Sequence, residues 1–403
     1  MKPLDGIRIA EFGFFIVGPL TGKILADYGA EVIKIESATR PDPHRNIYPF
    51  KDEEPGLDRA GRFHPYNTSK LSVTLNLSMS EGVEVAKRIV AHSDIVIENF
   101  AGGVMERMGL GYDELVKVNP KLIMLSSSMQ GQTGPHSKSQ GLGWQLTALS
   151  GFFSVAGWPE MRPLGPDGPY TDYIAPHFNV LGILGALDHL RRTGEGQFID
   201  ASQYENGVHF LAPLVLDYSA NKRIAGMMGN RHPDAAPHGA YRCLGSDRWC
   251  VIAVFTDEEW LSFRKTLGYP EWSERSEFST HARRKLNENE LDRLVESWTL
   301  EHSPEKVTTI LQAAGVSAGM VQVTGEEVLD KDPQLKSRRF IRELDHPELG
   351  KHRAPGVPFR LSKSPYDVQR SPLLGEHNEY VLKQVAGMTD DEIADIVVDG
   401  VVE

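Results

Sequence analysis

The first third of the chain alternates short apolar runs with segments of helical spacing, and this alternation constrains the fold most strongly. Residues 7–12 form a short apolar run. Residues 19–28 have helical spacing that stops before Gly29, and residues 31–35 are a second strand-like run. The pattern therefore predicts a βαβ unit at the start of the chain.

The same alternation continues beyond this unit. Ser78 and Glu81 have the spacing of a capping box, which predicts a helix beginning at Ser78. A second helix is expected over residues 112–118. Further strands are expected over residues 71–77, 94–97 and 122–126. Alternation of this kind is typical of a parallel, doubly wound α/β sheet, whose ligands bind beyond the carboxyl ends of the strands.

The length of 403 residues predicts two or three domains. We expect a large α/β domain over residues 1–224, which includes an apolar helix over residues 175–190 and a strand over residues 198–200. A smaller α+β domain is expected over residues 225–320. The proline-rich segment 321–403 is expected to pack on the large domain or on a partner subunit.

Composition disfavours several classes of protein. The 43 Lys and Arg residues against 55 Asp and Glu give a formal net charge of −12, which disfavours nucleic acid and anionic membranes as partners. Cys243 and Cys250 suggest neither a disulfide framework nor a zinc site. We find no signal peptide, and the apolar stretch 173–187 is too short to cross a bilayer. A cytoplasmic location is therefore expected.

Common cofactor and nucleophile motifs do not fit. The glycines at positions 13, 18 and 22 match neither the dinucleotide fingerprint nor the P-loop. The GxSxG match at residues 315–319 follows a helical pattern and precedes a strand, the reverse of a nucleophile elbow. No HExxH, EF-hand or CxxC pattern occurs. We therefore expect neither a metal nor a permanently bound cofactor.

A few charged residues are candidates for chemistry. Arg45, Lys70 and Arg107 fall in or near loops where a phosphate-bearing ligand would meet the sheet, although each taken singly is typical of a solvated surface charge. Asp172 precedes the apolar helix, where an acid usually caps free backbone N–H groups. From the residues alone, both a cap and a catalytic carboxylate remain open.

Short motifs spread along the chain resemble those of the class III, formyl-CoA transferase-like CoA-transferases. The similarity covers nearly the whole chain, and succinyl-CoA:arylsuccinate (benzylsuccinate-type) enzymes are one possible subgroup. The matching segments are, in order, residues 3–8, 18–19, 25–36, 97–100, 107–109, 119–120, 131–135, 193–197, 229–231 and 374–377.

The resemblance implies a mechanism and a set of contacts. Asp172, ten residues before Gly182, would be the nucleophile that forms an aspartyl anhydride and then an aspartyl-CoA thioester, with CoA esters as substrates. Ser37 and Gln140 stand where some relatives carry a base against CoA phosphates, so Arg45 or Lys138 is expected to substitute. The positions implied to contact CoA are Ile16, Val17, Leu75, Ser78, Asn99, Phe100 and Arg107.

Several alternatives remain beside this interpretation. An α-methylacyl-CoA racemase of the same fold needs a His that segment 140–144 lacks, and a non-catalytic CoA-binding subunit is a second alternative.

The resemblance implies an interlocked dimer of identical or paralogous chains. Segment 229–239 is a candidate source of oxyanion N–H donors, a lid or a linker. A bulky or aromatic acceptor acid would fit an acyl pocket lined by Phe14, Phe15, Trp144, Phe152 and Phe153.

Overall fold

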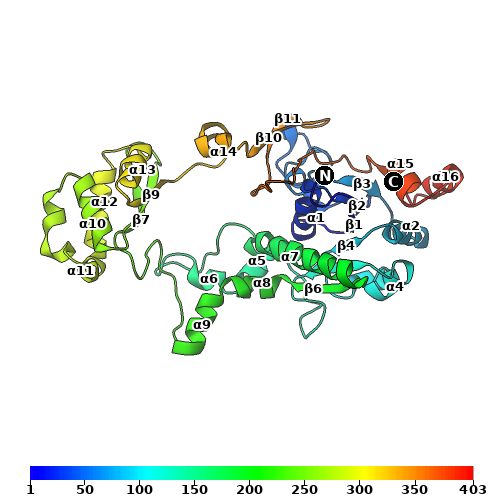
Figure 1. Cartoon of the computed structure of the whole chain (residues 1–403), viewed down its shortest axis with the longest axis horizontal. Coiled ribbons are helices and arrows are strands. Elements are labelled where there is room, and N and C mark those ends of the chain that lie inside the picture. The colour runs from blue at the N-terminus through cyan, green and yellow to red at the C-terminus, as the bar shows by residue number, and fades with distance from the viewer. Residues whose placement is uncertain (403) are drawn as a thin grey trace. The chain divides into compact units, whose positions relative to one another are not determined.

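The computed structural model describes residues 1–402 and divides into two compact units (Figure 1). The larger unit combines Met1–Phe152, Gly165–Ile224 and Pro333–Glu403. The smaller unit combines Phe153–Leu164 and Ala225–Asp332. The chain thus passes from the larger unit to the smaller one and back twice. The domain limits expected at residues 224 and 320 stay a prediction.

A six-stranded parallel sheet forms the centre of the larger unit, with strand order β3-β2-β1-β4-β5-β6. The order reverses between β1 and β4, so the doubly wound α/β prediction is confirmed. The strands are β1 (Arg8–Glu11), β2 (Glu31–Glu36), β3 (Leu71–Thr74), β4 (Ile95–Glu98), β5 (Ile123–Ser128) and β6 (Phe198–Ser202). The helices used below are α1 (Val17–Asp27), α2 (Ser80–Ala91), α3 (Val104–Arg107), α4 (Tyr112–Val118), α5 (Gly143–Leu149), α7 (Tyr170–Thr193), α8 (Gln203–Phe210) and α9 (Ala212–Asn221).

Both faces of this sheet are covered by helices, which explains why its strands are rich in apolar residues. Successive side chains of a strand point to opposite faces. Ile9 and Val32 belong to a hydrophobic cluster with residues of α1 and α7. Ala10 and Ile33 belong to a second cluster with residues of α2. The helices therefore cover the two faces and leave the carboxyl edge of the sheet for a ligand.

The predicted capping box at Ser78 is wrong. Helix α2 begins at Ser80 after Met79, and no side chain caps its first turn. The hydroxyl of Ser78 donates instead to Asn76 Oδ1 at 2.5 Å. Because the Ser78 hydroxyl is bonded to Asn76, two residues earlier, it does not cap the helix, and the helix starts later than the spacing predicts. The helix expected over residues 112–118 is confirmed as α4.

Arg45 and Lys70 are neither solvated surface charges nor available for a phosphate. Arg45 has no exposed surface, forms an ion pair with Glu36 at 2.8 Å and lies 3.5 Å from the centre of the Phe63 ring. Lys70 is buried against Glu11, with Nζ and Oε2 2.8 Å apart. Buried charges require partners of opposite sign, and these two bases have them within the fold.

The C-terminal part of the chain contains a hairpin of β10 (Ile341–His346) and β11 (Gly350–Pro355) and then reaches the edge of the main sheet. The backbone N–H of Thr74 donates to Asn378 Oδ1 at 2.9 Å. The N–H of His377 donates to the carbonyl of Ser72, also at 2.9 Å. These bonds cover the otherwise open edge of β3.

The smaller unit has an antiparallel sheet in the order β7-β8-β9, formed by β7 (His238–Arg242), β8 (Trp249–Ala253) and β9 (Ser317–Met320). Its helices are α10 (Asp257–Thr266), α11 (His281–Leu286), α12 (Glu288–Thr299) and α13 (Pro304–Ala313). Ser317 opens β9 after α13, so the GxSxG match stands in helix-to-strand order, as expected. Among residues 1–402, no helix is long and apolar enough to cross a membrane.

Candidate active site

Asp172 lies in the first turn of α7 but does not cap it. The helix begins after Pro169, whose side chain forms no cap hydrogen bond, and the first-turn N–H of Thr171 donates to Thr147 Oγ1 at 3.4 Å, not to Asp172. Within the part of the chain that the structure describes, the carboxylate of Asp172 takes part in no hydrogen bond or ion pair. The cap interpretation therefore has no support in the geometry, and the carboxylate remains available for another role.

The start of α5 holds the Asp172 carboxylate in place. A Cβ built on Gly143 would lie 2.0 Å from Asp172 Oδ1 and 2.4 Å from its Cγ, so the carboxylate packs directly on the glycine backbone. The hydroxyl of Thr171 donates to the carbonyl of Gly143 at 3.2 Å, and that of Thr147 donates to the same carbonyl at 2.7 Å. These bonds fix α5 against the first turn of α7. Sequence reasoning gave Gly143 no role and missed this contact.

Burial raises the pKa of Asp172 to about 7. Desolvation is the cause, because removing water disfavours the charged carboxylate when no cation or N–H donor replaces it. A carboxylate with a pKa near neutrality is a stronger base than an exposed one and is available as a nucleophile in a large fraction of molecules at pH 7. A residue that served only to cap a helix would show the opposite shift.

A pocket of about 710 Å³ lies at the carboxyl ends of β1 to β4, where the strand order reverses. Three of the residues predicted to contact CoA, Leu75, Ser78 and Phe100, line it. Phe14 also lines it, with its ring centre 5.2 Å from that of Phe100. The volume is within the range of small-molecule and cofactor sites. This is the position at which doubly wound sheets bind ligands.

The other four predicted contacts lie outside the pocket lining. Ile16 and Val17 are buried at the start of α1, so only their backbone can reach a ligand. Asn99 holds the loop after β1, since its side chain accepts from the N–H of Phe14 at 2.9 Å and donates to the Phe14 carbonyl at 3.0 Å. Arg107 is exposed at the end of α3.

Sequence reasoning missed Arg40 as the basic residue of this pocket. Arg40 lines the pocket and is solvent-exposed. Among residues 1–402, its guanidinium forms no ion pair or hydrogen bond. Ser37 lines the same wall and accepts from the Arg40 backbone N–H at 3.3 Å. Arg45, which was expected to replace the missing base, is excluded by its burial against Glu36.

Of the five aromatic residues expected to form one acyl pocket, Phe14 and Phe15 lie together, and the pocket as a whole stays a prediction. Phe14 and Phe15 are 5.2 Å apart in the loop after β1. Phe152 packs instead against Tyr170, with ring centres 5.2 Å apart. Trp144 is 45% exposed on α5. Aromatic composition alone does not show which rings share a cluster, because strand ends and helices distribute them by topology.

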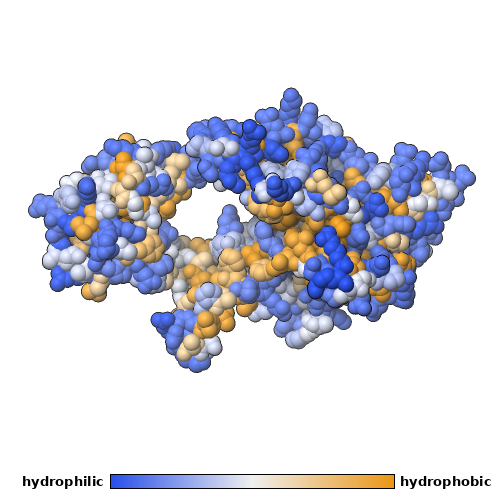
Figure 2. All heavy atoms as spheres, in the orientation of Figure 1, coloured by the Kyte–Doolittle hydropathy of each residue, from blue (hydrophilic) through white to orange (hydrophobic). Residues whose placement is uncertain are grey.

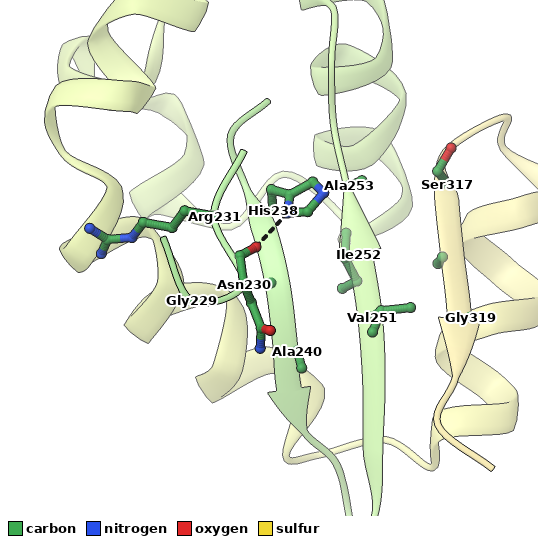
Figure 3. A pocket seen from close by; sticks show the side chains of 12 residues that line it. Gly229, Asn230, Arg231, His238, Ala240, Val251, Ile252, Ala253, Ser317 and Gly319 are labelled. Atoms are coloured by element: carbon green, nitrogen blue, oxygen red, sulfur yellow. Dashed lines mark hydrogen bonds between the residues drawn. The ribbon is translucent and has the colours of Figure 1, made fainter. Parts of the chain in front are cut away.

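The smaller unit has a pocket of about 570 Å³ between residues 229–231 and the open face of its sheet (Figure 3). The carbonyl of Asn230 accepts from His238 Nδ1, while the Arg231 side chain extends away from the strands (Figure 3). Part of segment 229–239 thus builds a pocket wall and the beginning of β7. Its role as an oxyanion donor or a lid stays a prediction.

Metal-ligating side chains do not gather in the described part of the chain. Over residues 1–402 no group of three His, Cys, Asp or Glu side chains has the geometry to hold a metal ion. Cys243 and Cys250 are both free thiols in the core of the smaller unit.

The chain is similar to known proteins along nearly its whole length. The sequence model of CoA-transferase family III matches residues 4–378. Succinyl-CoA–D-citramalate CoA-transferase of Chloroflexus aurantiacus is 34% identical over 399 residues, or 98% of this chain and 96% of that protein. The beta subunit of the succinyl-CoA–L-malate CoA-transferase of the same organism is 31% identical, over 98% of this chain and 96% of that protein.

A solved structure extends the similarity to the fold. The crystal structure of a CaiB/BaiF family protein from Brucella suis matches with a TM-score of 0.85 and 30% identity, over 95% of this chain and 99% of that chain. The family match, the relatives and the fold all span nearly the full length. The chain therefore belongs to CoA-transferase family III.

Proposed function

We propose that this enzyme transfers CoA from succinyl-CoA to a short dicarboxylic acid through covalent intermediates on Asp172. The observation that carries the proposal is the environment of the Asp172 carboxylate. It is desolvated, it forms no cap hydrogen bond, and it packs against the backbone of Gly143. The names of the relatives, a citramalate and a malate CoA-transferase that use succinyl-CoA, support an aliphatic dicarboxylic acceptor over an arylsuccinate.

The reaction needs no net oxidation and no energy input. A carboxylate oxygen of Asp172 attacks the thioester carbonyl, the C–S bond breaks, and CoA leaves as a thiolate, which gives a mixed anhydride. The thiolate then attacks the aspartyl carbonyl, releases the donor acid and forms an aspartyl-CoA thioester. The acceptor carboxylate attacks this thioester, and the released thiolate takes the acceptor's acyl group, which restores Asp172.

The pocket at the carboxyl ends of β1 to β4 would hold the nucleotide end of CoA. Arg40 would pair with its phosphates, because it is the exposed cation on the pocket wall. Phe14 and Phe100 would pack against the apolar parts of the ligand. Binding energy from this remote end holds the thiolate beside Asp172 between the steps.

The test is the replacement Asp172→Asn, which keeps the shape of the side chain and its capping ability. We expect CoA-ester binding and thermal stability to stay normal while transfer falls by at least about 10³-fold, because an amide cannot form the anhydride. Asp167→Asn, an exposed aspartate five residues earlier, is the matched control. Full activity of Asp172→Asn, or a hydroxylamine-trapped acyl group on another peptide, would exclude Asp172 as the nucleophile.

The proposal also includes a second chain that covers exposed apolar side chains of the larger unit. Helix α9 has no buried residue, and apolar side chains on α7, α8 and α9 are more than two-fifths exposed (Figure 2). These are Leu181, Leu184, Phe210, Val215, Leu216 and Tyr218. An apolar surface of this kind is typical of a chain–chain interface, and a chain of the same family would cover it. Native mass measurement of the purified chain distinguishes a homodimer from a subunit that needs a paralogue.

A further inference from the structure

An aromatic cluster in the larger unit includes Tyr173, the residue that follows Asp172. Tyr173 follows Asp172 in α7, and its hydroxyl oxygen lies 3.2 Å from that of Tyr66. The ring of His44 stacks on Tyr66 with centroids 5.5 Å apart, and the edge of Phe15 meets His44 at 5.4 Å. The contact between the two hydroxyl groups thus joins Tyr66 to the first turn of α7, which carries Asp172.

The positive charge of Arg62 affects the pKa values of two members of this aromatic cluster. Burial raises the pKa of Tyr66, the Tyr173 hydroxyl and the Asp172 charge act in the same direction, and Arg62 opposes them. Burial lowers the pKa of His44, and Arg62 adds to that lowering. Arg62 therefore contributes to the pKa shifts of both Tyr66 and His44, whereas the pKa shift of Asp172 is caused by desolvation. Arg62 and Tyr66 lie four residues apart in the same short segment of the chain.

The guanidinium of Arg62 is anchored but not neutralised. Its Nε donates to the carbonyl of Tyr48 at 2.9 Å, and the side chain is exposed. Within residues 1–402 its two terminal nitrogens form no ion pair or hydrogen bond. An arginine fixed through Nε presents a planar pair of N–H donors, which is the geometry that binds a carboxylate.

We propose that Arg62, with the hydroxyls of Tyr66 and Tyr173, binds the far carboxylate of a dicarboxylic acyl group whose other carboxyl reacts at Asp172. This inference rests on the proposed function. Tyr66 lies four residues after Arg62, and Tyr173 follows Asp172 in α7, so the contact between the two hydroxyls links the segment of the cation to the helix of the nucleophile. Donor and acceptor form the same kind of anhydride on Asp172, so one carboxylate subsite serves both.

The experiment measures selectivity between a dicarboxylic and a monocarboxylic acyl group. The full-length enzyme catalyses exchange of labelled succinate into succinyl-CoA, or of labelled butyrate into butyryl-CoA, and kcat/KM is determined for each pair. We expect Arg62→Gln to lower the succinyl-to-butyryl ratio by roughly 10- to 100-fold, the usual effect of losing hydrogen bonds to a charged group. Tyr66→Phe and Tyr173→Phe lower it by a few fold each.

The matched control is Arg191→Gln, an exposed arginine near the other end of α7, which should leave the ratio unchanged. A merely structural role for Arg62 would lower both exchange rates together, and that result overturns the subsite. An unchanged ratio in Arg62→Gln, or a wild-type enzyme that exchanges butyrate as fast as succinate, overturns it as well while the proposed CoA transfer stands. Absence of exchange with every acyl-CoA would refute the transfer itself.

Discussion

Gly143 provides a sharp test of how the nucleophile is positioned. In Gly143→Ala, the new methyl group would lie 2.0 Å from Asp172 Oδ1, 2.4 Å from Cγ and 2.7 Å from Oδ2. Ordinary contacts of a Cβ atom begin near 3.4 Å. The whole carboxylate must therefore shift by more than about 1 Å, and a displacement of that size at a reacting group costs about 100-fold in rate. This corresponds to about 2.7 kcal/mol of activation free energy.

The assay compares kcat for CoA exchange and the dissociation constant of a CoA ester in the wild type and the variant. We expect kcat to fall by about 100-fold with binding unchanged, because the ligand pocket is built by other segments. Alanine is a better helix former than glycine, so α5 should remain folded. Gly141→Ala is the matched control, since its methyl group would meet only the flexible end of Met129. Normal kcat in Gly143→Ala would show that the Asp172 geometry described above is not the reactive one.

Three further outcomes are expected. Because only the carboxylate form attacks and burial raises the pKa of Asp172 to about 7, kcat/KM should rise with pH through that value, and a pH profile that is flat between 5 and 8 would contradict this. Arg40→Ala and Arg107→Ala should each weaken CoA-ester binding by about 1.5–3 kcal/mol in titrations, and unchanged affinity would remove that residue from the site. Arg45→Met should lower the free energy of unfolding by about 3–5 kcal/mol in denaturant melts, because it leaves Glu36 buried without its partner.

The sequence predicts the sheet well because hydrophobic periodicity is a local signal. Each strand of the doubly wound sheet is a short apolar run, and the helix over residues 112–118 is recovered residue for residue. Local competition limits such predictions, as at Ser78, whose hydroxyl bonds to Asn76 instead of opening α2. Periodicity therefore identifies elements more reliably than it identifies their first residues.

Tertiary contacts explain why the site was predicted only in part. Asp172 could be named from its resemblance to a family, but its contact with Gly143 spans 29 positions and leaves no local signal. Arg45 looks like a surface base until Glu36 and Phe63 are seen to enclose it. Arg40, five residues earlier, lies on the pocket wall. Which arginine serves a ligand is decided by burial, and burial is a property of the whole fold.

The return of the C-terminal segment to β3 has a consequence for synthesis on the ribosome. All six strands have been synthesised once residue 202 is made, but the bonds that cover the β3 edge come from His377 and Asn378. At about 5–20 residues per second, the edge stays open for roughly ten to thirty seconds. During that interval the nascent sheet exposes unpaired N–H and C=O groups to neighbouring nascent chains. Residues 225–332, which form most of the smaller unit, are synthesised within this interval, so their number lengthens the time for which the larger unit remains open to aggregation.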